Sequence, residues 1–424
     1  MELILNPSRQ EWDRLCVRNI PDDSRIEETV KEIIENVRLN GDKALLEYAR
    51  RFDKYEGNEL LVADEEIERR AATVNPEVAD AIRKAAENIA LFHKAQMPQA
   101  VEVSTKPGVR CLQKAVAISK VGLYIPGGRA PLFSTVLMLA IPAHIAGCEE
   151  IVLCTPEGPS GIAPEILFAA KLCGIHKVFR IGGAQAIAAM GFGTDSVPAV
   201  HKIFGPGNRF VTKAKQMISR TTAIDMPAGP SEVMVLADES ANPVFVAADM
   251  LSQAEHGPDS QAIAVCDSEK LAKEIAAQIE RLADMLPRRD SIEGSLSHSR
   301  IITFDSASEM IEFANEYAPE HLIISMKEPW EQAEKIKAAG SVFIGNYSPE
   351  SAGDYASGTN HTLPTSAWAR SFSGVNIDSF MHKITYQELT PEGLEELSSV
   401  ITTMAHAEGL DAHAMAVDVR LKKI

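Results

Sequence analysis

Hydrophobic and polar positions follow two different patterns along the chain, and the change falls near residue 100. Residues 27–51 and 63–97 carry apolar side chains every three or four positions, with charged side chains between them. This spacing gathers the apolar side chains on one face of an α-helix. We therefore predict that the first hundred residues are mainly helical.

After residue 120, short β-branched runs alternate with amphipathic stretches and with turns rich in glycine and proline. Predicted strands begin at Val121, Glu150, Lys177 and His201, and a predicted helix follows each of them. A second series of predicted strands covers residues 232–236, 261–266, 301–304, 321–325 and 341–344. Strands that alternate with helices are typical of parallel sheets covered on both faces.

The expected fold is of the α/β class, with two Rossmann-like, incomplete doubly wound α/β domains. Residues 1–120 together with 233–380 are expected to form the first domain and its N-terminal helices. Residues 121–232 are expected to form the second domain. Residues 381–424 are expected to form a helical C-terminal tail, which is too short to bury a core of its own.

Length and charge narrow the class of protein. A chain of 424 residues is long enough for two or more domains, and its net charge of -17 opposes nucleic acid or an anionic membrane as a partner. The N-terminus lacks the pattern of a signal peptide. The most apolar stretch, residues 133–146, is interrupted by Pro142 and His144 and is shorter than the roughly 20 residues of a membrane span.

The cysteine pattern indicates a reduced, cytoplasmic protein. The six cysteines form no CxxC pair and no dense disulfide framework. A transition-metal site in this chain is therefore expected to use histidine, carboxylate or amide ligands.

Candidate metal ligands occur where a predicted helix ends. Gln253 and His256 are three residues apart on one face of that helix, which Gly257 and Pro258 terminate. An imidazole and an amide oxygen suit Zn²⁺. The alternative, a polar helix end that faces solvent, remains open on spacing alone.

Two further segments carry candidate catalytic groups. Glu320 and His321 follow Pro319 at the start of a predicted strand, and together they could supply two general bases. A surface turn with ordinary charges is the alternative. The polar loop at residues 351–361 contains Asp354 and His361, and its two glycines allow close approach of the backbone to a ligand.

The glycine-rich turns at residues 126–128, 182–183 and 205–208 each close a predicted strand, where open α/β sheets bind ligands. None of them matches GxGxxG or GxxxxGK[ST]. They favour a cleft for a small molecule without identifying it. Near the C-terminus, Glu408 and His413 flank Gly409, and a solvated tail is the default interpretation there.

Eight segments, in order along nearly the whole chain, resemble the histidinol dehydrogenases. They are residues 121–128 (VGLYIPGG), 181–188 (IGGAQAIA), 204–208 (FGPGN), 225–232 (DMPAGPSE), 251–261 (LSQAEHGPDSQ), 318–322 (APEHL), 351–361 (SAGDYASGTNH) and 407–413 (AEGLDAH). Each segment is a weak signal alone, but chance does not explain eight in the right order.

The resemblance implies the NAD-dependent, four-electron oxidation of L-histidinol to L-histidine through L-histidinal, the last steps of histidine biosynthesis. It implies one Zn²⁺ per subunit, held by Gln253, His256, Asp354 and His413. It also implies a homodimer with shared active sites, in which the tail crosses to the other subunit. Most of the zinc and catalytic site is then expected in the first domain, and NAD in the second.

Individual roles also follow from the resemblance. His321 is expected to act as the base in both oxidations, and Glu320 to activate water for the second. The implied substrate contacts are Ser231, Gln253, His256, Glu320, His321, Asp354, His361, Glu408 and His413. The implied cofactor contacts are Tyr124, Gln185 and Asn208.

Three other functions compete with this expectation. A relative on the same scaffold could oxidise another small diol or amino alcohol, although His361 and Glu408 favour histidinol. A zinc hydrolase is disfavoured because the chain has no HExxH sequence. A non-catalytic protein that uses zinc to join a dimer would leave Glu320 and His321 without a role.

Overall fold

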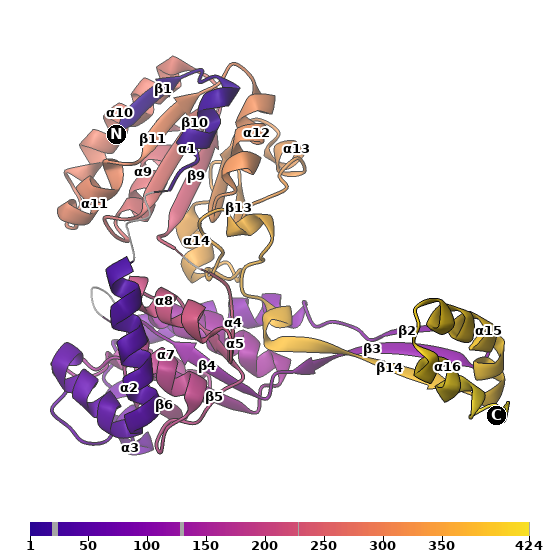
Figure 1. Ribbon diagram of the computed structural model, residues 1–424. Coiled ribbons are helices and arrows are strands. Elements are labelled where there is room, and N and C mark those ends of the chain that lie inside the picture. Colours follow the sequence, from indigo (N-terminus) through magenta and orange to yellow (C-terminus); the bar gives the residue numbers. More distant parts are fainter. Residues whose placement is uncertain (19–23, 128–130, 228, 424) are drawn as a thin grey trace.

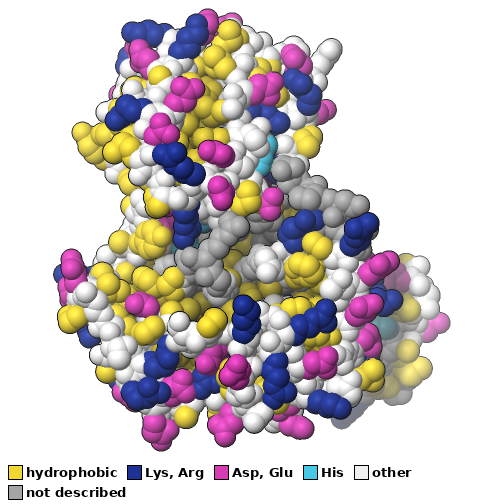
Figure 2. Space-filling model, turned by 90° about the vertical axis from the view of Figure 1, so that its left-hand side faces the viewer, with side chains coloured by type: hydrophobic (Ala, Val, Ile, Leu, Met, Phe, Trp, Pro, Cys, Tyr) yellow, Lys and Arg dark blue, Asp and Glu magenta, His cyan; other side chains and the backbone are white. Residues whose placement is uncertain are grey.

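The structure, a computed structural model, describes residues 1–18, 24–127, 131–227 and 229–423. Gly128 and Ala228, which belong to two of the family-like segments, lie outside the described residues. Figure 1 shows two lobes, each built on a parallel sheet, and an arm that extends from the lower one. Figure 2 shows acidic and basic side chains intermixed over one face of both lobes. No helix in the described ranges is long and apolar enough to cross a membrane.

The upper lobe contains a six-stranded parallel sheet, sheet A, with strand order β1-β11-β10-β9-β12-β13. Its central strand, β9, is completely buried, and its side chains alternate between the two cores on either face of the sheet. A continuous apolar run is typical of a strand covered on both faces. The strands are β1 (Glu2–Leu5), β9 (Glu232–Ala237), β10 (Gln261–Cys266), β11 (Arg300–Thr303), β12 (His321–Ser325) and β13 (Ser341–Ile344).

Helices cover both faces of sheet A, as the alternating pattern predicts. On one face the apolar core includes residues of α9 (Pro243–Ala254), α10 (Glu269–Ala283) and α11 (Arg289–Leu296). On the other face the core includes residues of α1 (Trp12–Leu15), α12 (Ala307–Tyr317) and α13 (Pro329–Ala333).

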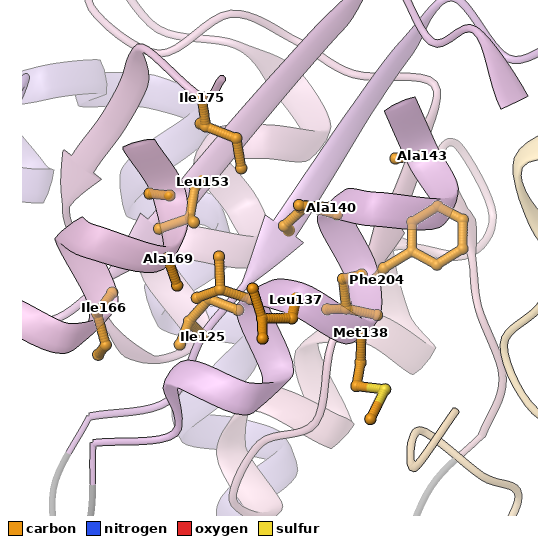
Figure 3. Close-up of a cluster of buried hydrophobic side chains, with 14 of the residues drawn as sticks. Ile125, Leu137, Met138, Ala140, Ala143, Leu153, Ile166, Ala169, Ile175 and Phe204 are labelled. Carbon is orange, nitrogen blue, oxygen red and sulfur yellow. The ribbon is translucent and has the colours of Figure 1, made fainter. Parts of the chain in front are cut away.

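The lower lobe contains a five-stranded parallel sheet, sheet B, with strand order β6-β5-β4-β7-β8. The side chains of α5, β4, β5 and α6 interlock in one of its cores, where Leu137 lies among Ile125, Leu153 and Ile166 (Figure 3). The elements are β4 (Lys120–Tyr124), α5 (Phe133–Ala146), β5 (Glu150–Thr155), α6 (Pro164–Leu172), β6 (Lys177–Arg180), α7 (Gly183–Phe192), β7 (Lys202–Phe204), α8 (Arg209–Ile218) and β8 (Ala223–Ile224).

The N-terminal helices pack on sheet B, which differs from the grouping predicted from the sequence. Helix α2 (Ser24–Tyr48) packs on α7 and α8, α3 (Asp64–Ala71) on α6, and α4 (Pro76–Lys94) on α5. Of the elements that the structure describes in the first hundred residues, β1 and α1 join sheet A. An amphipathic pattern shows that a helix has an apolar face, but it does not show which sheet that face covers.

The arm is a three-stranded antiparallel sheet, with β3 (Val109–Ala117) between β2 (Val101–Lys106) and β14 (Met381–Leu389). Helices α15 (Pro391–Ala407) and α16 (Asp411–Asp418) pack together at its far end (Figure 1). The expected helical tail, residues 381–424, therefore begins with a nine-residue strand. Strands β2 and β14 are almost entirely exposed within this chain, and neither carries the continuous apolar run of a buried strand.

Candidate active site

A cavity of about 160 Å³ lies between the two lobes. The lower lobe contributes Thr135 at the start of α5 and Gly205 after β7. The upper lobe contributes most of the polar groups. Six of the residues predicted to contact substrate line this one cavity: Ser231, His256, Glu320, His321, Asp354 and His361.

The two sheets present opposite edges to this cavity. Ser231 and Glu320 immediately precede β9 and β12, and His321 is the first residue of β12, so all three lie at the amino ends of sheet A strands. Sheet B instead points its carboxyl ends at the cavity, because Gly205 follows β7. Open α/β sheets usually bind ligands at the carboxyl ends of their strands, and here only sheet B places those ends at the cavity.

The backbone of Glu232 fixes the catalytic candidates. Its N–H donates to Oε2 of Glu320 at 2.7 Å, and its carbonyl oxygen lies 3.1 Å from Nδ1 of His321. Because a carbonyl oxygen only accepts, Nδ1 carries the proton, and Nε2 of the neutral ring holds a lone pair. Nε2 is buried, has no hydrogen-bond partner among the described residues and lies 3.7 Å from Asp354 Oδ1.

Burial shifts the protonation of both side chains. Desolvation lowers the pKa of His321 to about 3, which keeps the imidazole neutral and able to accept a proton. Desolvation also raises the pKa of Glu320 well above its usual value, although the bond from Glu232 opposes that shift. A neutral imidazole beside a carboxyl group of raised pKa is suited to acid–base catalysis near neutral pH.

A cluster of potential metal ligands adjoins the cavity. One ligand atom each from His256, Glu350 and Asp354 lies within 4.8 Å of the others. Glu350 and Asp354 lie four residues apart on α14 (Glu350–Tyr355), so they share one face. Glu350 is buried, and its Oε2 has no hydrogen-bond partner within the described part of the chain.

Gln253 lies on α9, three residues before His256. Its side chain is fully buried, and neither Oε1 nor Nε2 has a partner in the described residues. Buried polar groups normally form hydrogen bonds, so an unpartnered amide near a cluster of carboxylates fits coordination of a cation. An imidazole, carboxylates and an amide oxygen form a donor set suited to zinc.

His361 links the two lobes across the cavity. Its Nδ1 lies 2.9 Å from the carbonyl oxygen of Asp354, and its Nε2 lies 3.2 Å from Oγ1 of Thr135. Burial lowers the pKa of His361 to about 4. The ring thus contacts both α14, which carries Glu350 and Asp354, and the lower lobe, which carries the second cavity.

This second cavity, of about 650 Å³, lies at the carboxyl ends of sheet B. Tyr124 at the end of β4, Gln185 in α7 and Asn208 all line it. The side chain of Asn208 also caps α8, since it accepts hydrogen bonds from the N–H groups of Phe210 and Val211. All three predicted cofactor contacts therefore share one cavity.

Two predicted site residues lie elsewhere in this chain. Glu408 follows α15 and His413 is in α16, and both are exposed at the end of the arm. Conversely, sequence reasoning did not identify Glu350, Thr135 or Glu232. Only Glu350 carried a usable signal, its four-residue spacing from Asp354, which matches the spacing argument applied to Gln253 and His256.

Comparisons with known proteins agree with this geometry. The family model described as histidinol dehydrogenase matches residues 17–421. A histidinol dehydrogenase of Bacteroides fragilis is 57% identical over 426 residues, with 100% of both chains covered. One from Haemophilus influenzae is 52% identical, covering 94% of this chain and 93% of its own. A crystal structure of histidinol dehydrogenase from Elizabethkingia anophelis superimposes with a TM-score of 0.97 at 48% identity, covering 100% of this chain and 98% of that one. This chain belongs to the histidinol dehydrogenase family.

Proposed function

We propose that this protein oxidises L-histidinol to L-histidine through L-histidinal, in two NAD-dependent steps at the end of histidine biosynthesis. One observation carries the proposal: six side chains from separate segments, which the family resemblance assigns to substrate, line one cavity between the lobes. A nearby cavity holds the three assigned cofactor contacts. The family membership supports oxidation of histidinol over another small diol or amino alcohol.

The residues fit one bound Zn²⁺ per subunit. Gln253, His256 and Asp354 would hold it, with His413 from the exchanged tail as the fourth ligand, and Glu350 lies beside them. The ion would orient the imidazole and amine of the substrate. The unpartnered amide of Gln253 supports this assignment, because burial of an unused amide is costly.

His321 is the proposed base of both oxidations. Its Nε2 would take the hydroxyl proton of histidinol and later that of the aldehyde hydrate, while NAD accepts a hydride in each step. The carbonyl of Glu232 holds the ring in the tautomer that this role requires. Glu320 would remove a proton from the water that adds to histidinal. Ser231 and His361, which both line the cavity, would contact the substrate.

We also infer a cytoplasmic homodimer in which the tails are exchanged. Glu408 and His413 lie at the end of an arm that carries exposed apolar side chains, including Val400, Met404 and Met415. Exposed apolar groups gathered on one element are typical of a protein–protein interface. A second subunit would cover them and receive Glu408 and His413 into its own site.

Absorbance at the NADH band tests the chemistry directly. Purified protein, NAD and L-histidinol should yield two NADH for each histidinol consumed, and a chelator should abolish the reaction. One NADH per substrate would contradict the second step and the role of Glu320. No NADH from zinc-loaded protein with histidinol, but turnover of another amino alcohol or diol, would favour the related dehydrogenase instead.

A further inference from the structure

Asp53 is a half-buried acidic group that the chemistry described above does not use. It is the last residue of a π-helical turn, Ala49–Asp53, that follows α2, and it lines the 650 Å³ cavity with Tyr124 and Gln185. The backbone N–H of Gly182 acts on its carboxyl group and opposes the rise in its pKa. One of its oxygens, Oδ2, is buried and has no partner in the described ranges.

Asp53 occupies a place where a phosphate would ordinarily bind. The amino end of a helix attracts anions, and α7 begins at Gly183 with Gly182 as its cap. Here the N–H of Gly183 donates to Oη of Tyr124 at 3.1 Å, and the N–H of Gly182 acts on the carboxyl group of Asp53. A phosphate at this end of α7 would compete with Tyr124 for the N–H of Gly183 and would lie beside a carboxylate.

Oδ2 of Asp53, which has no partner among the described residues, favours a ligand group that donates a hydrogen bond. An ionised carboxylate only accepts hydrogen bonds, so the ligand atom that reaches Oδ2 must carry a hydrogen. Among the described residues, no lysine or arginine lowers the pKa of Asp53. Burial raises the pKa of Asp53 to about 6, which shows that the surroundings do not compensate its charge.

The position of the cavity indicates which part of a dinucleotide lies here. Among the described residues, the 650 Å³ cavity and the catalytic cavity share no lining side chain. The reacting end of the cofactor must reach the catalytic cavity, so the larger cavity is left for the adenosine end. The hydroxyl groups of that end belong to its ribose.

We propose that Asp53 determines cofactor specificity, by accepting a hydrogen bond from an adenosine ribose hydroxyl of NAD and by repelling the phosphate that NADP carries at the 2′ position. Acidic residues act in this way at the ribose of other dinucleotide sites. The inference rests on the proposed NAD-dependent function. Asp53 is a specificity residue in it, and no proton transfer of the reaction involves it.

Calorimetric titration of the holoenzyme with NAD and with NADP tests this role. Asp53→Asn keeps the shape of a half-buried side chain, so the fold should be retained. We expect NAD binding to weaken at least about tenfold and the preference for NAD over NADP to shrink by a larger factor. Asp195→Asn, an exposed site outside the cavity with the same change of charge, should leave both affinities unchanged.

A second arm needs no variant. Analogues of NAD that lack the 2′- or the 3′-hydroxyl of the adenosine ribose are titrated into the unmodified enzyme, and loss of one hydroxyl should weaken binding at least about tenfold. Unchanged affinity for both analogues, together with an unchanged NAD to NADP ratio in Asp53→Asn, would overturn the inference and leave the proposed function intact. An unmodified enzyme that binds neither NAD nor NADP would overturn both.

Discussion

Glu320 and His321 are held by the two polar groups of one backbone residue, the N–H and the carbonyl of Glu232. The side chain of Glu232 is fixed in turn by Arg18, with both nitrogen–oxygen distances at 3.1 Å, and by the N–H of Ser366 at 2.8 Å. Neighbouring residues on a strand point to opposite faces, yet this anchoring at the strand end brings both side chains to one cavity.

Substitutions of His321 and of Glu320 should impair different steps of the reaction. His321→Asn removes the proposed base of both steps and should lower kcat for histidinol and for histidinal by about 100-fold or more. Glu320→Gln should lower aldehyde oxidation by a similar factor and alcohol oxidation much less. Stopped-flow measurement of NADH formation from each substrate checks this. Equal losses on both substrates in Glu320→Gln would contradict the division of roles.

Replacement of Gln253 by leucine tests whether this side chain is a metal ligand or only a buried amide. An unused buried amide destabilises the protein, so Gln253→Leu would then raise the melting temperature and leave zinc content unchanged. If Gln253 is a ligand, its substitution should reduce the zinc that the protein retains after dialysis by about tenfold or more. Elemental analysis and a thermal melt distinguish these cases, with Gln278→Leu, at a half-buried position on α10, as the control.

Mixed subunits test the exchange of tails. His321→Asn removes the base from one chain, and His413→Ala removes the tail ligand from the other. If tails are exchanged, an equal mixture should recover about a quarter of the normal activity, because half of the dimers are mixed and each contains one intact site. A mixture no more active than its components would show that each tail serves its own chain.

The stability of the cofactor-free protein should depend on pH through Asp53. Its pKa is raised from 3.8 to about 6 on folding, mainly by burial, so the folded state holds the proton more tightly than the unfolded state. Stability from this group is therefore present below about pH 4 and is lost as pH rises towards about 6. Asp53→Asn should raise the melting temperature near pH 8 and change it little near pH 4, and Asp195→Asn should do neither.

Gly205 should tolerate no side chain. Its φ of 122° lies in a region that favours glycine, and an added Cβ would lie 2.1 Å from the carbonyl oxygen of Tyr124. Gly205→Ala should reduce the free energy of unfolding by at least about 2 kcal/mol, measured by urea denaturation. Gly158→Ala, with no atom within 4 Å of the added carbon, is the matched control and should cost little. Equal stability of the two variants would contradict this account.

The sequence predicted the two sheets well because their strands are short apolar runs bounded by glycine and proline. Strands such as β9 and β12 are buried on both faces, so no register or partner is needed to recognise them. The strands of the arm were not predicted, because β2 and β14 are exposed within one chain and carry no continuous apolar run. Strand β2 pairs with β3 in a local hairpin, whereas β14 pairs with β3 across a large sequence distance.

The candidate site was predictable only in part, for a similar reason. Spacing along one helix placed Gln253 beside His256, and glycine-rich turns marked the end of sheet B strands where Asn208 lies. The contact of His361 with Thr135 joins residues 226 positions apart, and no local pattern encodes it. Its partners become visible only once both sheets are assembled, whereas the roles of Glu408 and His413 came from family resemblance alone.

Sheet A presents its amino edge and sheet B its carboxyl edge to the space between the lobes. The two sides of that space therefore differ in electrostatic potential. In a parallel sheet the crossover helices run against the strands, so α9 ends at the amino edge of sheet A, while α5 and α8 begin at the carboxyl edge of sheet B. A helix carries about half a negative charge at its end and about half a positive charge at its start. One wall of the interlobe space therefore favours a metal ion and an ammonium group, and the other favours an anionic dinucleotide, through chain direction alone.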